Sequence, residues 1–386
     1  MSRVKIITAV SPLRAYSGIK YLAEALTKVN VDVEVIAKIP RKDLHETKNW
    51  PIKVRSFYSN WYGRIPLLRR YMTHLEFILI SVFKADVIVF HELSFYRSVV
   101  YLKKLFPRKK FIHYCTELYD EKDVPEHKNL LKFYMKYSNI PDLIIECDKG
   151  REKLRKEIYN IKKPTVVIPN TIPKSEIPSK SANGSLASIA GMTKLPENMP
   201  IIIYTGGAYL HRQLDIIVDA ISNVNEEIFF LAFCYGEKAA IEQLKDECET
   251  KLGKNNYKIC KSVPRKELLE CIHEATAGIV YYKPSLSIGN LYAAPTKLYE
   301  YIAANVPVIS SNNPGIVSLV TNHHLGSCVK DETIEALTSA IENLVFDDKR
   351  IYEIKKNQKE VFDNQLCYEI ASKEGINAIL KLIRKS

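Results

Sequence analysis

A lysine and a glutamate stand one helical turn apart in the segment AAPTKLYEYIAANVPVIS (293–310). Pro295 is favoured in the first turn of a helix, where its missing N–H costs nothing, so we predict that a helix begins there. Lys297 then lies where a cation opposes the helix dipole, unless an anion is bound. Glu300, on the same face, could accept hydrogen bonds from vicinal hydroxyls, as an acidic residue does for a ribose. The spacing indicates a nucleoside diphosphate site; the alternative is an ordinary i, i+3 ion pair, worth about 0.2 to 0.5 kcal/mol.

A second group of residues suited to anion binding lies in the segment YTGGAYLHRQLDIIVDAI (204–221). Gly206 and Gly207 follow the first predicted strand of the second half, and Arg212 comes just before a predicted helix. Glycine lets the backbone approach a phosphate closely, and a guanidinium can bind one directly. The glycines do not form a G-x-G-x-x-G fingerprint, and the chain has no P-loop pattern, which disfavours a hydride-transfer enzyme.

Apolar runs of strand length alternate with longer segments of helical period along the chain. Continuous apolar strands separated by helices are typical of parallel sheets covered on both faces, and ligands of such sheets bind beyond the carboxyl ends of the strands. We therefore predict an α/β protein with two Rossmann-like, doubly wound parallel-sheet domains that face a central cleft. The predicted parts are a domain at 1–171, a Ser-, Lys- and Pro-rich linker at 172–199, a domain at 200–364, and a C-terminal helix at 365–386 that packs back towards the first domain.

The positive charge of the chain is confined to its first half. Of a formal net charge of +12, residues 1–180 hold 34 Lys and Arg against 19 Asp and Glu, a net +15, and the rest hold 22 against 25, a net −3. This asymmetry indicates that one domain faces an anionic surface, such as phospholipid headgroups, a nucleic acid or a phosphorylated substrate; the alternative is a lysine-rich surface that serves solubility.

The cysteines and the apolar segments indicate a cytosolic protein. The eight cysteines form no C-x-x-C pair and no zinc-ligand spacing, so we expect neither disulfides nor structural zinc. The start MSRVKIITAVSPL lacks the order of a secretion signal. The apolar window FILISVF (77–83) falls far short of the roughly twenty residues that a spanning helix needs.

Three segments resemble the GT-B glycosyltransferases of the family 4 type: AAPTKLYEYIAANVPVI (293–309), YTGGAYLHRQLDIIVDAI (204–221) and VVIPNTI (166–172). The segment SGIKYLAEALTKVNVDVEVIAKI (17–39) is similar to the glycine loop and first helix of that family. The resemblance implies a GT-B fold with an acceptor-side first domain and a second domain that binds a nucleoside diphosphate sugar. It also implies a retaining, metal-independent transfer that uses no cofactor, and the chain has no D-x-D pair.

The resemblance assigns roles by position. Arg212 and Lys297 are expected to hold the donor diphosphate and neutralise the leaving nucleotide, Glu300 to bind the ribose, and Gly18 to let the first loop approach the phosphates. The backbone near Val263 is expected to meet the base. The donor-binding residues implied in this way are Gly18, Gly206, Gly207, Val263, Pro295, Thr296, Leu298 and Glu300.

The sequence departs from the family pattern at two positions. Tyr292 stands where relatives often carry a second glutamate, eight positions before Glu300, so the donor-sugar contact of that residue is not carried over. Thr116 stands where relatives commonly have a histidine, ahead of Glu117 and Leu118, so a histidine-centred mechanism cannot be transferred to this chain.

Acceptor contacts are predicted in the first domain. His91 and Glu92 follow the strand ADVIVF (85–90) and would face the cleft; the alternative is a polar pair satisfied at a strand end. Glu117 belongs to a segment that resembles the family near the acceptor. The segment 55–84 mixes Arg and Lys with Trp, Tyr and Phe, which is typical of a helix at a membrane interface, although a helix packed in the core is the alternative.

The resemblance implies transfer of a sugar to a saccharide acceptor, one that is lipid-linked if 55–84 meets a membrane, in cell-surface polysaccharide or glycolipid assembly. The protein would then be cytoplasmic and peripheral on the inner face of the plasma membrane. A nucleotide-sugar 2-epimerase of the same fold is the first alternative, and would need cleft carboxylates for proton transfer. A basic nucleic-acid-binding protein ranks last, because no basic helix or ribonucleoprotein aromatic motif occurs.

Overall fold

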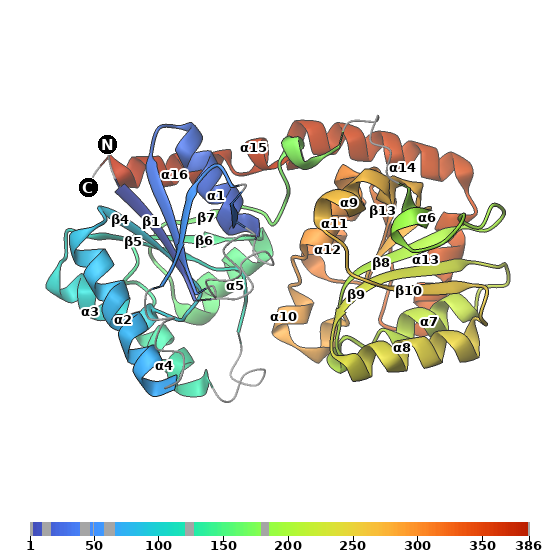
Figure 1. The fold of residues 1–386 in the computed structure, drawn as a ribbon, viewed down its shortest axis with the longest axis horizontal. Coiled ribbons are helices and arrows are strands. Elements are labelled where there is room, and N and C mark those ends of the chain that lie inside the picture. The colour runs from blue at the N-terminus through green and yellow to red at the C-terminus, as the bar shows by residue number, and fades with distance from the viewer. Residues whose placement is uncertain are drawn as a thin grey trace. The chain divides into compact units, whose positions relative to one another are not determined.

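The computed structural model describes residues 3–9, 17–38, 47–48, 50–57, 66–119, 127–178 and 185–384 (Figure 1). The chain divides into two compact units. The first unit consists of residues 1–169 together with 371–386, and the second unit consists of residues 170–370. The chain therefore crosses between the units twice, after Pro169 and after Ile370.

The first unit is built on a seven-stranded parallel sheet in the order β3-β2-β1-β4-β5-β6-β7. Its inner strands read as continuous apolar runs because helices cover both faces of the sheet. The strands are β1 (Arg3–Thr8), β2 (Asp32–Ala37), β3 (Lys53–Ser56), β4 (Val87–His91), β5 (Lys110–Tyr114), β6 (Leu143–Glu146) and β7 (Thr165–Val167).

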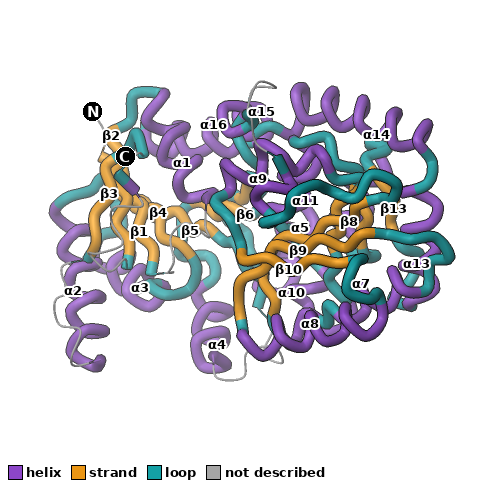
Figure 2. Tube along the Cα trace, turned by 45° about the vertical axis from the view of Figure 1, so that its right-hand side comes forward, coloured by secondary structure: helices purple, strands orange, loops and turns teal. Residues whose placement is uncertain are grey.

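Helices α1 and α16 lie on one face of this sheet, and α2, α3 and α4 lie on the other (Figures 1 and 2). Phe77 of α2 and Phe95, just before α3, stack with ring centroids 4.5 Å apart and anchor these helices in the core. The helices of this unit are α1 (Ser17–Lys28), α2 (Pro66–Phe83), α3 (Tyr96–Leu105), α4 (Lys128–Tyr137), α5 (Lys149–Tyr159) and α16 (Lys373–Ile383).

The second unit holds a six-stranded parallel sheet in the order β10-β9-β8-β11-β12-β13. Its strands are β8 (Ile201–Ala208), β9 (Phe229–Gly236), β10 (Tyr257–Lys261), β11 (Ala277–Val280), β12 (Val308–Ser310) and β13 (Gly326–Cys328). Its helices are α6 (Leu186–Ile189), α7 (Asp215–Ser222), α8 (Lys238–Lys251), α9 (Arg265–Cys271), α10 (Ile288–Leu291), α11 (Thr296–Ala303), α12 (Pro314–Asn322), α13 (Ile334–Val345), α14 (Asp348–Val361) and α15 (Tyr368–Ala371).

The core of the second unit lies between its sheet and helices α7, α8 and α13. Ile217, Leu244 and Ile341 from these helices join Phe230 of β9 in one buried apolar cluster. Helix α11 contacts β11 and β12, and its Tyr301 ring occupies the space that a Cβ on Gly278 would take, since that atom would lie 2.5 Å from the ring. Gly278 thus lets α11 lie directly on the sheet.

The predicted fold class, two doubly wound parallel-sheet domains, is confirmed. In each sheet the strand order reverses direction beside the first strand of the unit, between β1 and β4 and between β8 and β11. Loops at the carboxyl ends of neighbouring strands diverge at such a switch point and leave room for a ligand.

The segment 172–199, predicted to be a linker, is assigned to the second unit. Its described residues include a short 3-10 turn at Lys174–Glu176 and helix α6. Leu186 is fully buried, and its backbone N–H donates to Glu274 Oε1 over 3.0 Å. The described residues of this segment therefore pack as part of the second unit, anchored by apolar residues such as Leu186.

Helix α16 closes the first unit against β7. Gly375 of this helix faces Ile168, and a Cβ on Gly375 would lie 2.4 Å from Ile168 Cγ1. Both residues are buried, so the helix can approach this closely only because Gly375 has no side chain.

We expect Gly375→Val to lower the free energy of unfolding by about 1 to 3 kcal/mol, because the added side chain overpacks the contact with Ile168. Asn377→Val places the same β-branched residue on the exposed side of α16 and serves as the control. Urea denaturation of both variants measures the difference. Equal stabilities of the two variants would show that α16 is not seated through Gly375.

Candidate functional site

Lys297 and Glu300 lie on α11, whose first turn follows the loop after β11. Pro295 is the residue that precedes the helix, with φ −78° and ψ 139°, and Lys297 lies in the first turn as the sequence predicts. The loop is held in place by Asn170, whose Nδ2 donates to the carbonyl oxygen of Ala294 over 2.8 Å. The first turn of α11 thus presents its backbone N–H groups at the carboxyl edge of the sheet.

The ammonium of Lys297 lies against aromatic rings. Its Nζ is 3.9 Å from the ring centroid of Tyr204 on β8 and 5.5 Å from that of Tyr282, after β11. In the part of the chain that the structure describes, no carboxylate lies within ion-pair distance of Lys297, and its side chain is 9 % exposed. A nearly buried cation in this setting is suited to an anionic ligand.

Gly206 makes room for this lysine. A Cβ on Gly206 would lie 3.0 Å from Lys297 Nζ, and the φ of Gly206 is +141°, which side-chain-bearing residues rarely adopt. Tyr204 fixes the same turn, because its hydroxyl donates to the carbonyl oxygen of Gly207 over 2.9 Å. The glycine pair therefore lies beside the lysine, although the two segments are far apart in the sequence.

Arg212 approaches the same site from the loop after β8. It ends the 3-10 turn Leu210–Arg212, and its Cζ lies 4.6 Å from the ring centroid of Tyr282. Tyr282 therefore contacts the guanidinium of Arg212 and the ammonium of Lys297 together. Burial, and next the nearby charge of Arg212, lower the pKa of Lys297 to about 7.

Glu300 is paired with an arginine that the sequence analysis missed. Its Oε1 forms an ion pair with Nε of Arg265, the first residue of α9, over 2.7 Å. The alternative considered for this segment, an ordinary ion pair between Lys297 and Glu300, is wrong for the described residues, because Glu300 pairs with Arg265. The only available sequence signal was the place of Arg265 at a helix start, two residues after Val263.

The other residues of the predicted donor site differ in accessibility. Thr296 and Val263 are half-buried, at the start of α11 and in the loop after β10. Leu298 points into the core and is 2 % exposed, so only its backbone could meet a ligand. A Cβ on Gly207 would lie 2.4 Å from the ring of Tyr209, which makes this glycine a packing requirement of the turn.

Gly18 belongs to the first unit and lies in the first turn of α1. A Cβ on Gly18 would lie 2.3 Å from the hydroxyl oxygen of Tyr114, at the end of β5. That hydroxyl is buried and has no hydrogen-bond partner among the described residues. Gly18 therefore makes room for a tyrosine hydroxyl at the N-terminus of α1.

His91 and Glu92 organise a turn in the first unit. Both ring nitrogens of the fully buried His91 are engaged, Nδ1 with Thr8 Oγ1 at 3.1 Å and Nε2 with Thr116 Oγ1 at 3.0 Å. Glu92 adopts φ +57°, and its Oε1 accepts from the backbone N–H groups of Thr116 and Glu117 at 2.6 and 2.9 Å. These contacts favour the satisfied polar pair, the alternative stated for these residues. Burial lowers the pKa of His91, against the opposing effect of Glu92, which favours the neutral ring.

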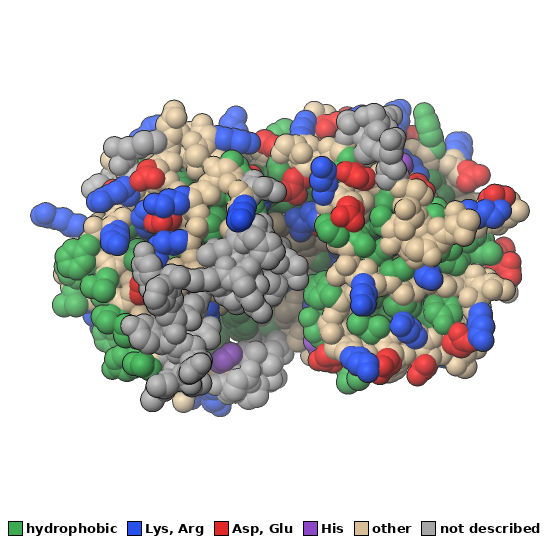
Figure 3. Space-filling model, in the orientation of Figure 1, with side chains coloured by type: hydrophobic (Ala, Val, Ile, Leu, Met, Phe, Trp, Pro, Cys, Tyr) green, Lys and Arg blue, Asp and Glu red, His purple; other side chains and the backbone are tan. Residues whose placement is uncertain are grey.

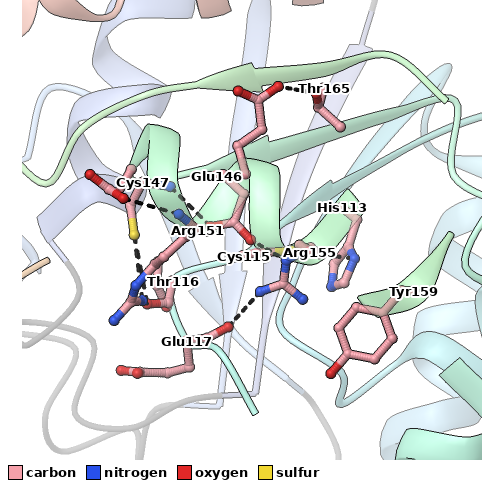
Figure 4. A network of polar contacts seen from close by, with 12 residues as sticks. His113, Cys115, Thr116, Glu117, Glu146, Cys147, Arg151, Arg155, Tyr159 and Thr165 are labelled. Atoms are coloured by element: carbon pink, nitrogen blue, oxygen red, sulfur yellow. Dashed lines mark hydrogen bonds and ion pairs between the residues drawn. The ribbon is translucent and has the colours of Figure 1, made fainter. Parts of the chain in front are cut away.

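Two arginines of α5, also missed by the sequence analysis, contact the backbone of the same turn (Figure 4). Arg155 forms an ion pair with the fully buried Glu146 and donates to the carbonyl oxygen of Glu117 over 2.6 Å. Arg151 donates to the carbonyl oxygen of Thr116. The backbone of Glu117 is therefore fixed, while its side chain is exposed.

The predicted residues thus fall into two groups. Gly206, Gly207, Arg212, Lys297 and Glu300 come together at the carboxyl edge of the second sheet. Gly18, His91, Glu92 and Glu117 belong to the first unit. Within the described ranges, no cluster of His, Cys, Asp or Glu has the arrangement of a metal site, and no helix has the length and apolarity needed to span a membrane.

Residues 189–361 match the family model described as "Glycosyl transferases group 1". This range contains the five residues that come together in the second unit, namely Gly206, Gly207, Arg212, Lys297 and Glu300. No curated protein matches the chain by sequence.

Solved structures with the same fold match the full length of the chain. A glycosyltransferase from Rickettsia africae matches with a TM-score of 0.76 and 15% identity, covering 100% of this chain and 99% of its own. Sucrose-phosphate synthase from Thermosynechococcus elongatus matches with a TM-score of 0.77 and 15% identity, covering 100% of both chains. HepE from Anabaena, solved with UDP and glucose, matches with a TM-score of 0.77 and 12% identity, covering 99% of this chain and 100% of its own.

These likenesses show that the protein has the GT-B fold. The family match and the fold together support glycosyltransferase activity.

We expect one lysine to titrate near pH 7, because burial and Arg212 disfavour the charged form of Lys297. NMR of the protein with ¹³C-methylated lysines measures this directly, and the signal should be absent in Lys297→Met. Arg212→Gln removes a like charge, so it should raise the pKa of Lys297, and bound sulfate should raise it as well. Titration of every lysine close to its ordinary value would contradict the environment described for Lys297.

Proposed function

We propose that the protein transfers a sugar from a nucleoside diphosphate sugar to a saccharide acceptor. The observation that carries this proposal is the pair of cations, Lys297 and Arg212, which share the ring of Tyr282 at the first turn of α11. Two positive groups beside free helix N–H groups are suited to a diphosphate. The bound UDP and UDP-glucose named for HepE support a nucleoside diphosphate sugar as the donor.

In this proposal the donor binds at the carboxyl edge of the sheet in the second unit. The diphosphate lies between Lys297, Arg212 and the turn of Gly206 and Gly207. The ribose hydroxyls bind Glu300, one turn further along α11, and the base meets the backbone near Val263. Pro295 and Thr296 start the helix that presents these groups.

The proposed reaction is a displacement at the anomeric carbon. The bond from that carbon to the β-phosphate oxygen breaks, a bond to the acceptor oxygen forms, and the acceptor proton passes to the departing phosphate. Negative charge grows on the leaving diphosphate, where Lys297 and Arg212 would stabilise it. This arrangement supports a retaining transfer in which the cations and the helix N-terminus take the part that a metal plays in other transferases, so no cofactor is proposed.

The alternatives are less well supported. A nucleotide-sugar 2-epimerase would need carboxylates placed for proton transfer, whereas Glu300, the carboxylate closest in sequence to Lys297, is paired with Arg265. The family match also favours the transferase. A nucleic-acid-binding role has no support from the fold or from the match.

The surface of the first unit supports a membrane-bound acceptor. Along α2 the exposed apolar residues Leu68, Tyr71, Leu75, Leu79 and Phe83 fall within about a third of the helix circumference, at 3.6 residues per turn. Tyr71 is 77% exposed and Phe83 is 70% exposed. On the face drawn in Figure 3, hydrophobic side chains gather over α2 and α3, where Tyr101, Leu105 and Phe106 are exposed as well.

Exposed cations surround this apolar surface, namely Lys84, Arg97, Lys104 and Arg108. Apolar side chains flanked by cations are typical of a surface that lies on an anionic bilayer. We therefore propose a cytoplasmic protein, peripheral on the inner face of the plasma membrane, with a lipid-linked saccharide acceptor of cell-surface polysaccharide or glycolipid assembly. Residues 58–65, part of the predicted segment 55–84, lie outside the described residues.

Lys297→Ala and Glu300→Ala should each weaken binding of the donor nucleotide by about 10- to 100-fold, because each removes a charge-assisted contact. The controls Lys254→Ala and Glu226→Ala change exposed residues that precede β10 and β9, at the opposite edge of the same sheet. Calorimetric titration with UDP, GDP and ADP, with and without attached glucose, measures the affinities, and circular dichroism checks the fold. Unchanged affinity in both site variants would refute the proposed donor site.

The double variant Leu79→Glu with Phe83→Glu should lose binding to vesicles of phosphatidylglycerol and phosphatidylcholine, because it places two carboxylates on the apolar stripe. Tyr352→Glu changes an exposed aromatic residue of α14 in the second unit and should bind as the wild type does. Sedimentation with vesicles gives the bound fraction, and nucleotide affinity should be the same in all three proteins. Equal vesicle binding by both variants would refute the proposed membrane contact of α2.

A further inference from the structure

Arg265 links the two places where the nucleoside of a donor would be held. It follows Val263 and Pro264 and is the first residue of α9, so its backbone lies beside the loop assigned to the base. Its side chain reaches α11, where Nε forms an ion pair with Glu300 Oε1 over 2.7 Å. The guanidinium also lies 3.8 Å from Glu176 Oε2.

This contact fixes the direction of the Glu300 carboxylate. A glutamate side chain has several rotatable bonds, and ordering it on ligand binding costs affinity. With Oε1 held by Arg265, the position of Oε2 is set, and no hydrogen bond to Oε2 occurs within the described residues. A carboxylate has about four lone-pair sites, so Glu300 can still accept from hydroxyl groups.

The pair is better placed to serve a ligand than to stabilise the fold. An ion pair with a solvent-exposed partner contributes little to stability, about 0 to 1 kcal/mol, and the Arg265 side chain is 28% exposed. Glu300, by contrast, is nearly buried, and it shares the first two turns of α11 with Lys297. An oriented carboxylate, one turn from a lysine that has no carboxylate partner among the described residues, is an arrangement suited to a ribose attached to a phosphate.

The neighbouring segment supports the arginine from its other side. Glu176 ends the 3-10 turn Lys174–Glu176, and this turn is tied down by Lys174, whose Nζ lies 3.4 Å from Asp363 Oδ1. Asn170, four residues before Lys174, holds the loop in front of α11 through Ala294. The start of the second unit thus supports both Arg265 and the beginning of α11.

We propose that Arg265 is a positioning residue for the ribose of the donor: it orients Glu300 so that the carboxylate accepts hydrogen bonds from the ribose hydroxyls. This inference rests on the proposed function, because it takes Glu300 to be the ribose contact. Arg265 itself need not touch the donor.

The test measures how well the protein distinguishes a ribose from a deoxyribose. Calorimetric titrations of the wild type and Arg265→Ala use UDP, GDP and ADP, their 2′-deoxy and 3′-deoxy counterparts, and inorganic pyrophosphate. In the wild type, the best-bound ribonucleotide should bind about 10-fold tighter than at least one of its deoxy counterparts, the value of a charge-assisted hydrogen bond. In Arg265→Ala this ratio should fall to below about 3, while pyrophosphate affinity stays within about twofold of the wild type.

Two further variants complete the design. Arg265→Lys keeps the charge and one donor, so it should recover part of the discrimination that Arg265→Ala loses. Arg350→Ala changes an arginine in the first turn of another helix of the same unit, α14, and should leave every affinity unchanged. If Arg265→Ala does not fold by circular dichroism, Arg265→Lys and Arg265→Gln carry the comparison, with Gln expected to discriminate less than Lys.

The outcomes separate this inference from the proposed function. A wild-type protein that binds none of the nucleoside diphosphates refutes the proposed function itself. A wild type that discriminates, with an Arg265→Ala variant that keeps the full ratio, overturns the inference and leaves the function standing. An equal loss for nucleotide and pyrophosphate also overturns it, because Arg265 would then act through its charge and not through Glu300.

Discussion

The candidate site depends on two cations held close together, and among the described residues no carboxylate lies within ion-pair distance of Lys297. Like charges repel, and in this protein the ring of Tyr282 contacts both cations, while the ring of Tyr204 contacts Lys297 as well. The negative faces of aromatic rings offset part of the repulsion but do not neutralise the charges, as a carboxylate would. With its pKa lowered to about 7, Lys297 is only partly protonated near neutral pH, and a diphosphate would supply a counter-charge that favours the charged lysine.

The fold supplies the places from which these groups converge. The sheet of the second unit reverses its strand order between β8 and β11, and the loops that leave these two strands carry Arg212 and Tyr282. Helix α11 can start beside them because two glycines give up space, Gly278 for the ring of Tyr301 and Gly206 for the ammonium of Lys297. Gly278 and Gly206 therefore determine both where α11 packs on the sheet and where the Lys297 ammonium lies.

Sequence patterns were sufficient for the fold class and for the residues of α11. Alternating strands and helices give a parallel sheet for topological reasons, and the positions of Pro295, Lys297 and Glu300 follow from local helix geometry. Local patterns could not reveal that Glu300 pairs with Arg265, 35 positions earlier, because that contact depends on how α9 and α11 pack. For the same reason the roles of Arg151 and Arg155 were not predicted, because their partners lie on β6 and in the loop after β5. His91 and Glu92 were predicted to be accessible, but tertiary packing buries both. The segment 172–199 was taken for a linker because composition alone does not show the few apolar contacts that anchor it.

Helix α16 ends the chain but belongs to the first unit, where it packs on β7 through Gly375. On the ribosome, the strands of the first sheet emerge early, yet their last covering helix is synthesised only after the entire second unit. Until α16 is synthesised, one face of β7 in the nascent first unit therefore has no covering helix. The packing of the first unit is thus completed only after the second unit has been synthesised, and that face of β7 stays exposed until then.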